Sequence, residues 1–375
     1  MWQPQGFYNQ YVLRTPVLLA GPESVRGLYN YPASRIAVIH GRSFKHVDDF
    51  VSAFAGKDVR CFERSWTGEP DLEGLKGTVG CLESFNPDLI IAVGGGSVID
   101  GCKLCRLFYE VPYYDRNVTR LSGAVLKTGF VAVPTTIGSG AEVSSAAVYV
   151  DRNTHAKNMI VMHELLPEAV VYDGRYVEGT PSGMLVRAAL DAMAHLLEGY
   201  VSNVENVMTE PMAEEGMALL HAELSLLVDG DLDAVSLDRL QHAGFLGGIV
   251  QNHRTVGAAH GVAHQLTEYG YAHSEAVGLL LPAVIKINST APEVNAKYRR
   301  IAGRSGFEDV DELLDFIREL QRAAGIFERR GELTELMERR IPDEAFCESI
   351  RNDRGGKGNP LEITDEYVKE LIGSI

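Results

Sequence analysis

The sequence predicts two domains of different class: an α/β domain built on a parallel sheet, followed by an all-α helical bundle domain. In the first half, strand-like apolar segments alternate with helical ones, which is the order typical of a parallel sheet with helices on both faces. After about Pro181 helical periodicity continues to the end of the chain, with almost no β-branched runs bounded by turns. We therefore expect one domain over residues 1–180 and a second over residues 181–375.

The elements of the first domain follow from short apolar runs bounded by turn residues. The expected strands are residues 35–40, 58–63, 88–96, 129–136, 146–151 and 168–173. Helices are expected over residues 44–54, over about 71–85, and directly after the third strand, where Ser97 can act as the cap. In the second domain, Pro181 suits the start of the helix GMLVRAALDAMAHLLEGYVS, because proline is tolerated in a first turn.

Composition excludes several classes of function. The 375 residues suffice for two cores, and the formal net charge of −16 argues against nucleic-acid binding because phosphates would be repelled. No apolar run is long enough to span a membrane, and the first residues lack the pattern of a signal peptide. The five scattered cysteines favour reduced thiols, so we expect a cytoplasmic protein without a disulfide framework.

A run of glycines lies at the end of the third expected strand, in the sequence Gly94-Gly95-Gly96-Ser97. Glycines let a backbone approach a pyrophosphate closely, and the free N–H groups of a helix start bind its charge. Three glycines at a strand end can also form only a tight turn. The run differs from the G-x-G-x-x-G fingerprint, so an ordinary Rossmann domain is not indicated.

Histidines concentrate in the second domain. Five lie between positions 242 and 273: His242, His253, His260, His264 and His273. One helical turn separates Asp191 from His195, and the same spacing separates His260 from His264, so each pair lies on one face of its helix. A carboxylate with imidazoles from separate helices suits a divalent metal such as Fe²⁺ or Zn²⁺. A buried histidine that is hydrogen-bonded in a core is the alternative for each residue.

Several separated motifs, in the same order along the chain, resemble the iron-containing (group III) alcohol dehydrogenase family. GGGSVIDGCK is similar to its GGGS-x-x-D-x-x-K segment, and VPTTIGSGAEVSS is similar to its P-T-T loop. ALDAMAHLLEGYVS is similar to the family's D-A-x-x-H-x-x-E-x-Y helix, and AAHGVAHQL and LLLPAVIKIN continue the likeness. The resemblance covers most of the chain. It implies a dehydroquinate synthase-like fold with an NAD(P)-binding first domain.

The resemblance also implies roles for individual residues. The metal ligands would be Asp191, His195, His260 and His273, with His264 as a catalytic histidine near the nicotinamide. The nucleotide site would comprise Gly41, Gly94, Gly95, Gly96, Ser97, Asp100, Thr135, Thr136, Ser144 and Lys157. Within it, Gly95, Gly96 and Ser97 would hold the pyrophosphate, and Lys157 would contact the cofactor ribose. A solvated lysine and a strand-end turn at the threonines are the alternatives.

Two departures from the family pattern bear on specificity. Gly41-Arg42-Ser43 stands where relatives that prefer NAD often carry an acidic residue, which favours NADP slightly because an acid would repel a 2′-phosphate. His253 and Arg254 replace more apolar residues upstream of His260. A guanidinium in the substrate pocket would favour a sugar or sugar acid over a simple alkanol. A surface position for Arg254 is the alternative.

These observations predict a metal-dependent NAD(P) oxidoreductase that interconverts a primary alcohol and its aldehyde. A dehydroquinate-synthase-like lyase or cyclase and a glycerol-dehydrogenase-like polyol oxidation are the enzymatic alternatives, and a non-catalytic assembly module is a third. A homodimer or a higher homo-oligomer is expected, because a strand within the apolar residues 11–20 would leave an open sheet edge that a second copy could cover. Pairing of this strand within its own sheet is the alternative.

Overall fold

The computed structural model describes residues 13–112, 114, 126–152, 157–229 and 233–375. The chain divides into two compact units, each with its own core. The sheet unit comprises Thr15–Glu178, and the helical unit comprises Gly179–Ile375 together with the described residues Leu13 and Arg14. The expected division at residue 180 lies close to this one, but Leu13 and Arg14 group with the helical unit.

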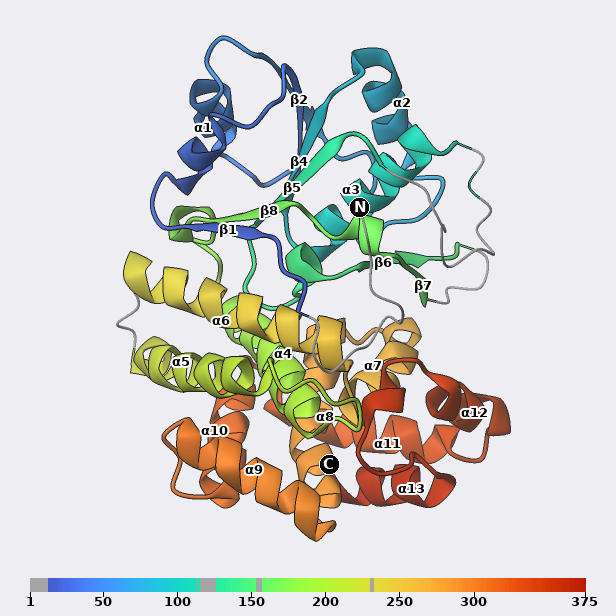
Figure 1. Ribbon diagram of the computed structural model, residues 1–375. Coiled ribbons are helices and arrows are strands. Elements are labelled where there is room, and N and C mark those ends of the chain that lie inside the picture. Colours follow the sequence, from blue (N-terminus) through green and yellow to red (C-terminus); the bar gives the residue numbers. More distant parts are fainter. Residues whose placement is uncertain (1–12, 113, 115–125, 153–156, 230–232) are drawn as a thin grey trace. The chain divides into compact units, whose positions relative to one another are not determined.

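Six parallel strands form the main sheet of the first unit, in the order β1-β8-β5-β4-β2-β3 (Figure 1). These strands are β1 (Val17–Ala20), β2 (Arg35–His40), β3 (Asp58–Glu63), β4 (Leu89–Gly94), β5 (Gly129–Pro134) and β8 (Ala169–Tyr172). The central strands β4 and β5 are buried along their whole length, as expected for strands covered on both faces. The parallel sheet predicted from alternation is confirmed.

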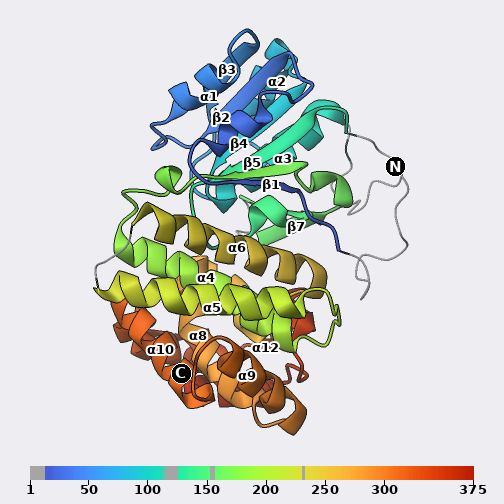
Figure 2. The ribbon, with the colours of Figure 1, turned by 60° about the vertical axis from the view of Figure 1, so that its left-hand side comes forward.

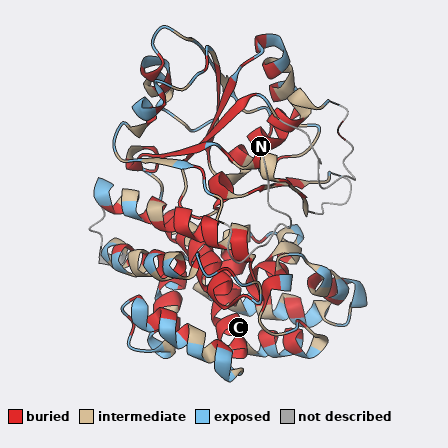
Figure 3. Cartoon of the chain, viewed as in Figure 1, coloured by how far each residue is buried: buried red, intermediate tan, exposed pale blue. Residues whose placement is uncertain are grey.

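Helices cover both faces of this sheet (Figure 3). They are α1 (Val47–Ala53), α2 (Lys76–Phe85) and α3 (Gly96–Glu110). Phe50 and Phe54 pack on the face that carries Ile36 and Val38. The opposite face packs against α2 and α3, with Leu82 among the contacts. The helix expected over about 71–85 begins later, at Lys76.

One expected strand lies outside the main sheet. β6 (Ala146–Val150) pairs antiparallel with β7 (Lys157–Val161), which the sequence pattern did not reveal, and the two form a separate hairpin. The expectation that residues 146–151 continue the parallel series is therefore wrong. A second correction concerns Ser97, which lies inside α3, because Gly95 occupies the cap position.

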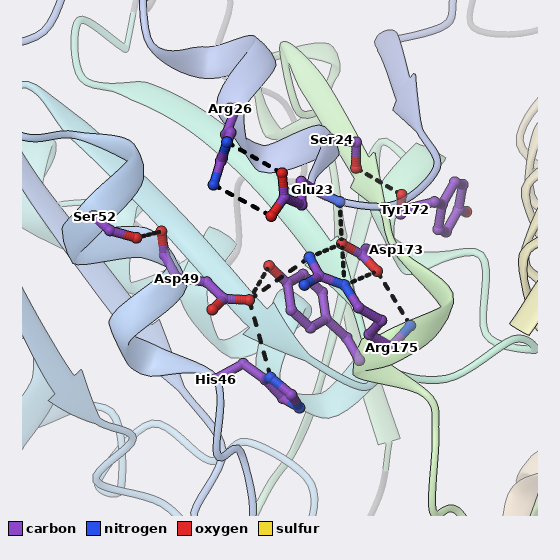
Figure 4. Close-up of polar contacts among 10 residues, drawn as sticks. Glu23, Ser24, Arg26, His46, Asp49, Ser52, Tyr172, Asp173 and Arg175 are labelled. Atoms are coloured by element: carbon purple, nitrogen blue, oxygen red, sulfur yellow. Dashed lines mark hydrogen bonds and ion pairs between the residues drawn. The ribbon is translucent and has the colours of Figure 1, made fainter.

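A polar cluster fastens the carboxyl ends of two strands to α1 (Figure 4). Asp173, directly after β8, is fully buried and accepts a hydrogen bond from the backbone N–H of Glu23, which follows β1 (2.8 Å). Asp173 also pairs with Arg175, whose guanidinium lies 3.7 Å from Asp49 of α1. The cluster holds this edge of the sheet by internal ion pairs.

The second unit is all helical (Figure 2). Its helices are α4 (Ser182–Val201), α5 (Glu210–Asp229), α6 (Ala234–Arg254), α7 (Ala258–Leu266), α8 (His273–Asn288), α9 (Pro292–Arg304), α10 (Val310–Ala323), α11 (Arg330–Arg340), α12 (Glu344–Asn352) and α13 (Asp365–Ser374). The inner helices α4 and α8 are buried on nearly all sides. Polar side chains on them therefore need partners inside the protein.

In the described part of the chain, no helix is both long and apolar enough to cross a membrane. β1 lies at the end of the strand order and pairs with β8, and Val17 is 62% exposed. Tyr11 and Val12 of the stretch expected to pair with a second copy lie outside the described residues. The predicted homodimer stays a prediction.

Candidate metal centre and nucleotide loop

Asp191 and His195 lie one turn apart on α4, where both side chains are buried. Asp191 Oδ1 and His195 Nε2 are 3.9 Å apart. The helix places them on the same face because four residues make about one turn. A carboxylate and an imidazole thus point together into the interior of the helical unit.

Two further histidines converge on the same oxygen atom. His260, on α7, brings its Nε2 to 3.4 Å from Asp191 Oδ1, and Nε2 of His273 lies 3.7 Å from it. His273 is the first residue of α8, directly after the turn through Gly270. Three helices therefore supply one carboxylate oxygen and three imidazole nitrogens at a single point.

The spacing of these atoms fits a bound metal ion. In a tetrahedral site with metal–ligand bonds of about 2.1 Å, neighbouring ligand atoms lie about 3.4 Å apart. Ligand atoms of Asp191, His195 and His260 all lie within 4.8 Å of one another. Asp191 Oδ1 and His260 Nε2 are buried without a hydrogen-bond partner, a costly arrangement that a cation would relieve. The residues fit Fe²⁺ or Zn²⁺.

Charge coupling within the cluster supports this interpretation. Burial alone would raise the pKa of Asp191, but the imidazoles of His195, His260 and His273 hold it well below its usual range. Burial opposes protonation of His260, but the adjacent carboxylates of Asp191 and Glu198 raise its pKa to about 9. The carboxylates of Asp191 and Glu198 therefore favour a positive charge at this point of the helical unit.

Glu198 is a site residue that the sequence reasoning did not assign. It lies on α4, is 1% exposed, and its Oε2 is 2.6 Å from Nδ1 of His260. Its Oε1 accepts a hydrogen bond from the backbone N–H of Ala259 at the start of α7 (2.7 Å). A carboxylate on the outer nitrogen of a metal-binding histidine fixes the ring orientation and tautomer. The glutamate in the α4 motif, seven residues after Asp191, was the available signal.

His264 is held by a second residue that the sequence reasoning missed. Its Nδ1 lies 3.0 Å from each carboxylate oxygen of Asp353, which follows α12. The His264 ring stacks on His273, with centroids 5.2 Å apart, and its side chain is 30% exposed. The histidine therefore adjoins the cluster, with its ring orientation set by Asp353. No local spacing links two residues so far apart in sequence.

The structure gives His253 and Arg254 internal partners in place of the expected substrate. Both ring nitrogens of His253 are engaged, by the carbonyl of Ile249 (2.9 Å) and by the backbone N–H of Arg14 (2.8 Å). Arg254 is 1% exposed, donates from Nε to the carbonyl of Val204 (3.1 Å) and lies 3.5 Å from Glu210. These contacts anchor backbone segments and indicate a structural role for both residues, and the expected substrate binding stays a prediction.

In the sheet unit, the glycine loop connects β4 to α3. An added Cβ on Gly95 would lie 3.2 Å from Thr136, and one on Gly96 would lie 2.8 Å from Ser139. The first backbone N–H groups of a helix have no acceptor within the helix. The start of α3 therefore offers hydrogen-bond donors beside glycines that carry no side chain. Side chains here would fill the cradle, which therefore fits the diphosphate of a dinucleotide.

The other expected nucleotide residues gather around this loop, with one exception. Thr135 follows β5, and its N–H donates to the carbonyl of Gly94 (3.1 Å). Lys157, at the start of β7, pairs with Glu69 (3.2 Å), and Ser144 accepts at Oγ from the N–H of Ala146 (3.0 Å). Asp100 is the exception, because its carboxylate contacts Lys103 and the backbone of Val148.

Asp100 belongs to an internal ion pair. Its carboxylate contacts the fully buried Lys103 (3.2 Å) and accepts from the N–H of Val148 (3.0 Å). Lys103 also donates to the carbonyls of Ser144 and Ala146. The pair ties α3 to the hairpin, which gives Asp100 a structural role, and its expected cofactor contact stays a prediction.

Comparison with known proteins assigns the family. The model of the iron-containing alcohol dehydrogenase family matches residues 18–174, and the model of the family's C-terminal domain matches residues 185–375. The chain belongs to the iron-containing alcohol dehydrogenases. Like its family, it is an oxidoreductase that acts on CH–OH groups and uses NAD(P) and a divalent metal.

Individual relatives are similar over most of their length. An alcohol dehydrogenase of Thermococcus barophilus is 29% identical over 81% of both chains. An NADPH-dependent butanol dehydrogenase of Clostridium saccharobutylicum is 27% identical over 94% of both. The iron-containing alcohol dehydrogenase of Thermococcus thioreducens superimposes with a TM-score of 0.87 at 26% identity, covering 96% of this chain and 98% of that one. Membership of this family disfavours the lyase and the assembly module as alternatives.

Proposed function

We propose that this iron-containing alcohol dehydrogenase interconverts a small, uncharged primary alcohol and its aldehyde. The observation that carries the proposal is the single carboxylate oxygen, Asp191 Oδ1, faced by three imidazole nitrogens at 3.4–3.9 Å. When bound, the metal would act as a Lewis acid on the substrate oxygen, and NAD(P) would exchange the hydride. Three imidazoles and a single carboxylate would leave coordination space for the substrate oxygen.

The protein's own residues would hold the ion and fix its geometry. Asp191, His195, His260 and His273 would be the ligands, and the buried Glu198 would keep Nδ1 of His260 protonated so that Nε2 faces the ion. Four ligands distinguish this arrangement from the three typical of glycerol dehydrogenases, so polyol oxidation is the less favoured alternative.

His264 would move the proton of the substrate hydroxyl. Asp353 accepts a hydrogen bond from Nδ1 of His264, which leaves Nε2 as the proton acceptor. A partly exposed histidine beside the four proposed ligands can pass that proton onward to solvent. The ring stacking on His273 keeps the imidazole next to the ligand set.

The preference for an uncharged substrate follows from the internal contacts of Arg254. A buried guanidinium that already contacts Val204 and Glu210 is not available to bind a sugar acid. Similarity to a relative named for butanol supports a short alkanol as the substrate.

The test combines metal analysis with a substrate panel. Anaerobically purified protein should contain about one iron or zinc per chain and reduce NAD(P)⁺ with propan-1-ol or butan-1-ol in preference to glycerol or glycolate. His273→Ala should lose both metal and turnover. His242→Ala serves as the control, because this half-buried histidine stacks on Phe245. Full metal and turnover in His273→Ala would contradict the ligand set.

We also propose a homodimer formed through β1. Its outer edge has no partner strand among the described residues, and pairing with a second copy would satisfy those backbone groups. Light scattering at micromolar concentration should report twice the chain mass, and a monomer would contradict this arrangement.

A further inference from the structure

Residues 353–359, which follow α12, run along one face of α7 in the direction opposite to that helix. Near the end of α7, the two carboxylate oxygens of Asp353 hold His264 (3.0 Å each). Three residues further along the segment, Gly356 lies against Gly261, because a Cβ added to Gly261 would be 3.0 Å from the Cα of Gly356. The contacts advance by three residues on both partners, so the segment follows a single face of the helix.

After three more residues, the 353–359 segment reaches the first turn of α7. The Oδ1 atom of Asn359 accepts a hydrogen bond from the backbone N–H of Ala258, the first residue of the helix (3.3 Å). Glu198 accepts from the next N–H, that of Ala259. A Cβ added to Gly257 would lie 2.9 Å from Glu198 Oε1 and 3.0 Å from Asn359 Oδ1. These two side chains therefore supply the acceptors that the first N–H groups of a helix otherwise lack.

Asn359 is itself held by a second buried amide. Asn288, at the end of α8, donates from Nδ2 to Oδ1 of Asn359 (2.9 Å) and accepts at Oδ1 from its Nδ2 (3.2 Å). The Nδ2 of Asn359 also donates to the carbonyl of Leu361 (2.9 Å), and the hydroxyl of Tyr367 donates to Oδ1 of Asn288 (3.0 Å). Since both polar atoms of each amide are engaged, the acceptor that faces Ala258 has one orientation.

The 353–359 segment also connects the three helices that carry the four proposed ligands. The side chain of Asn203, just after α4, donates to the carbonyls of Lys357 and Asn359 (3.0 Å each). Asn288 is the last residue of α8, and Ala258 is the first residue of α7. The position of the segment is therefore coupled to those of α4, α7 and α8 together.

We propose that Asn359 is a positioning residue of the metal centre, which sets the first turn of α7 and thereby the approach of His260 to Asp191. His260 is the third residue of this helix, and its Nε2 lies 3.4 Å from Asp191 Oδ1. Metal–ligand distances vary by only about 0.2 Å, so a small shift of this turn would weaken metal binding. The proposal rests on the ligand set of the proposed function, and Asn359 acts through the backbone of the helix.

Competition between the full chain and a chelating dye for Zn²⁺ measures the effect without turnover. Asn359→Ala should bind Zn²⁺ about tenfold more weakly, which is the usual effect of losing a group that orients a ligand. Asn359→Asp should lose less than about threefold, because its carboxylate still accepts from the N–H of Ala258. The loss of its donors should nevertheless lower the melting temperature. If stability alone mattered, metal affinity would follow the melting temperature in both variants.

Asn206→Ala is the matched control. Asn206 is also a buried asparagine of the helical unit, and its Oδ1 accepts from the backbone N–H of Met208 (3.1 Å). The substitution should lower the melting temperature and leave Zn²⁺ affinity unchanged. Equal losses of Zn²⁺ affinity in Asn359→Ala and Asn206→Ala, or in Asn359→Ala and Asn359→Asp, would overturn the proposal.

Gly261→Ala tests the same role without removing a polar group. Alanine favours a helix more than glycine does, so this variant should fold, but its methyl group would push the backbone of Gly356 away from α7. Zn²⁺ affinity should fall by about threefold to tenfold, and the visible absorption of bound Co²⁺, which depends on ligand geometry, should change. Gly303→Ala, on α9, adds the same methyl group where nothing lies within 4 Å and should change neither.

The two variants also separate this role from the ligand set. Unaltered Zn²⁺ affinity in either Asn359→Ala or Gly261→Ala would overturn the positioning role of Asn359. An unmodified chain that fails to bind Zn²⁺ would instead contradict the proposed ligand set, and the positioning role with it.

Discussion

The two units build their candidate sites from different materials. In the helical unit the candidate site consists of side chains: three imidazole nitrogens lie 3.4–3.9 Å from one carboxylate oxygen. In the sheet unit it consists of backbone: glycines at the start of α3 leave N–H groups and room for a diphosphate. Sites made of side chains tolerate little change in residue identity, whereas sites made of backbone tolerate little added volume. Variants in one unit should therefore affect only that unit's ligand.

The largest effect is expected for His260→Ala. The change removes a ligand atom and leaves Glu198 buried without its imidazole partner. Metal content should fall below about a tenth of an equivalent, and turnover should fall by about a thousandfold or more. Elemental analysis and steady-state kinetics measure the two quantities. Affinity for NAD(P)⁺ should stay within about twofold, and a parallel loss of cofactor binding would contradict the independence of the two sites.

His264→Ala should separate proton transfer from metal binding. The residue stacks on His273 without contributing one of the three imidazole nitrogens around Asp191 Oδ1. We expect near-complete metal occupancy with kcat lowered by about a hundredfold, the usual size of a general acid–base contribution. Loss of metal equal to that of His260→Ala would make His264 a ligand.

Metal affinity should depend on pH with a defined sign. The pKa of His260 is raised to about 9 in the metal-free site. The imidazole therefore carries an extra proton below that pH, and a metal ion must displace this proton to bind. Apparent affinity should therefore rise with pH, by up to about tenfold per unit between pH 7 and 9, and level off above 9. Competition with a chelating dye measures it. An affinity that is flat from pH 7 to 9 would contradict this coupling.

Glu198→Gln should weaken the metal site without removing a ligand. The amide can still accept from the N–H of Ala259, but the negative charge beside His260 disappears. Metal affinity should fall by about tenfold to a hundredfold. Glu214→Gln is the matched control, because Glu214 contacts the hydroxyl of Tyr200 (2.7 Å) and none of the ligands. Equal effects in the two variants would indicate a general loss of stability.

The smallest effect is expected in the glycine loop. A Cβ at position 96 would lie 2.8 Å from Ser139, so Gly96→Ala should lower cofactor affinity by about tenfold through crowding. Metal content should not change. Gly80→Ala, on α2, adds the same methyl group where nothing lies within 4 Å and should bind cofactor normally. Loss of metal in Gly96→Ala would show that the two sites are not independent.

The comparison also explains which features could be predicted from sequence. Asp191 with His195, and His260 with His264, were accessible because helical spacing fixes which side chains share a face. The parallel sheet followed from strand and helix alternation. The β6–β7 hairpin was missed because nothing in a single strand's pattern states whether its partner is parallel or antiparallel.

Contacts over long sequence separations lay beyond any local pattern. Asp353 meets His264, and Arg64 meets Ser97, only because the fold brings distant segments together. Arg254 shows the same limit: its position upstream of His260 suggested a pocket residue, and nothing in that spacing indicated that it would be 1% exposed and hydrogen-bonded to Val204. The identity of a residue predicts which interactions its side chain can make. The tertiary fold decides which partner the side chain actually contacts.

The two carboxylate oxygens of Glu198 would couple a bound metal ion to the protein backbone. One oxygen holds the imidazole of His260 and the other holds the N–H of Ala259, so the orientation of a ligand and the first turn of α7 depend on one carboxylate. Occupancy of the site should therefore slow deuterium uptake at the Ala259 amide, because opening this turn would release the ring that the ion fixes. The exchange rate of this one amide proton would therefore report metal occupancy, and its measurement requires no substrate.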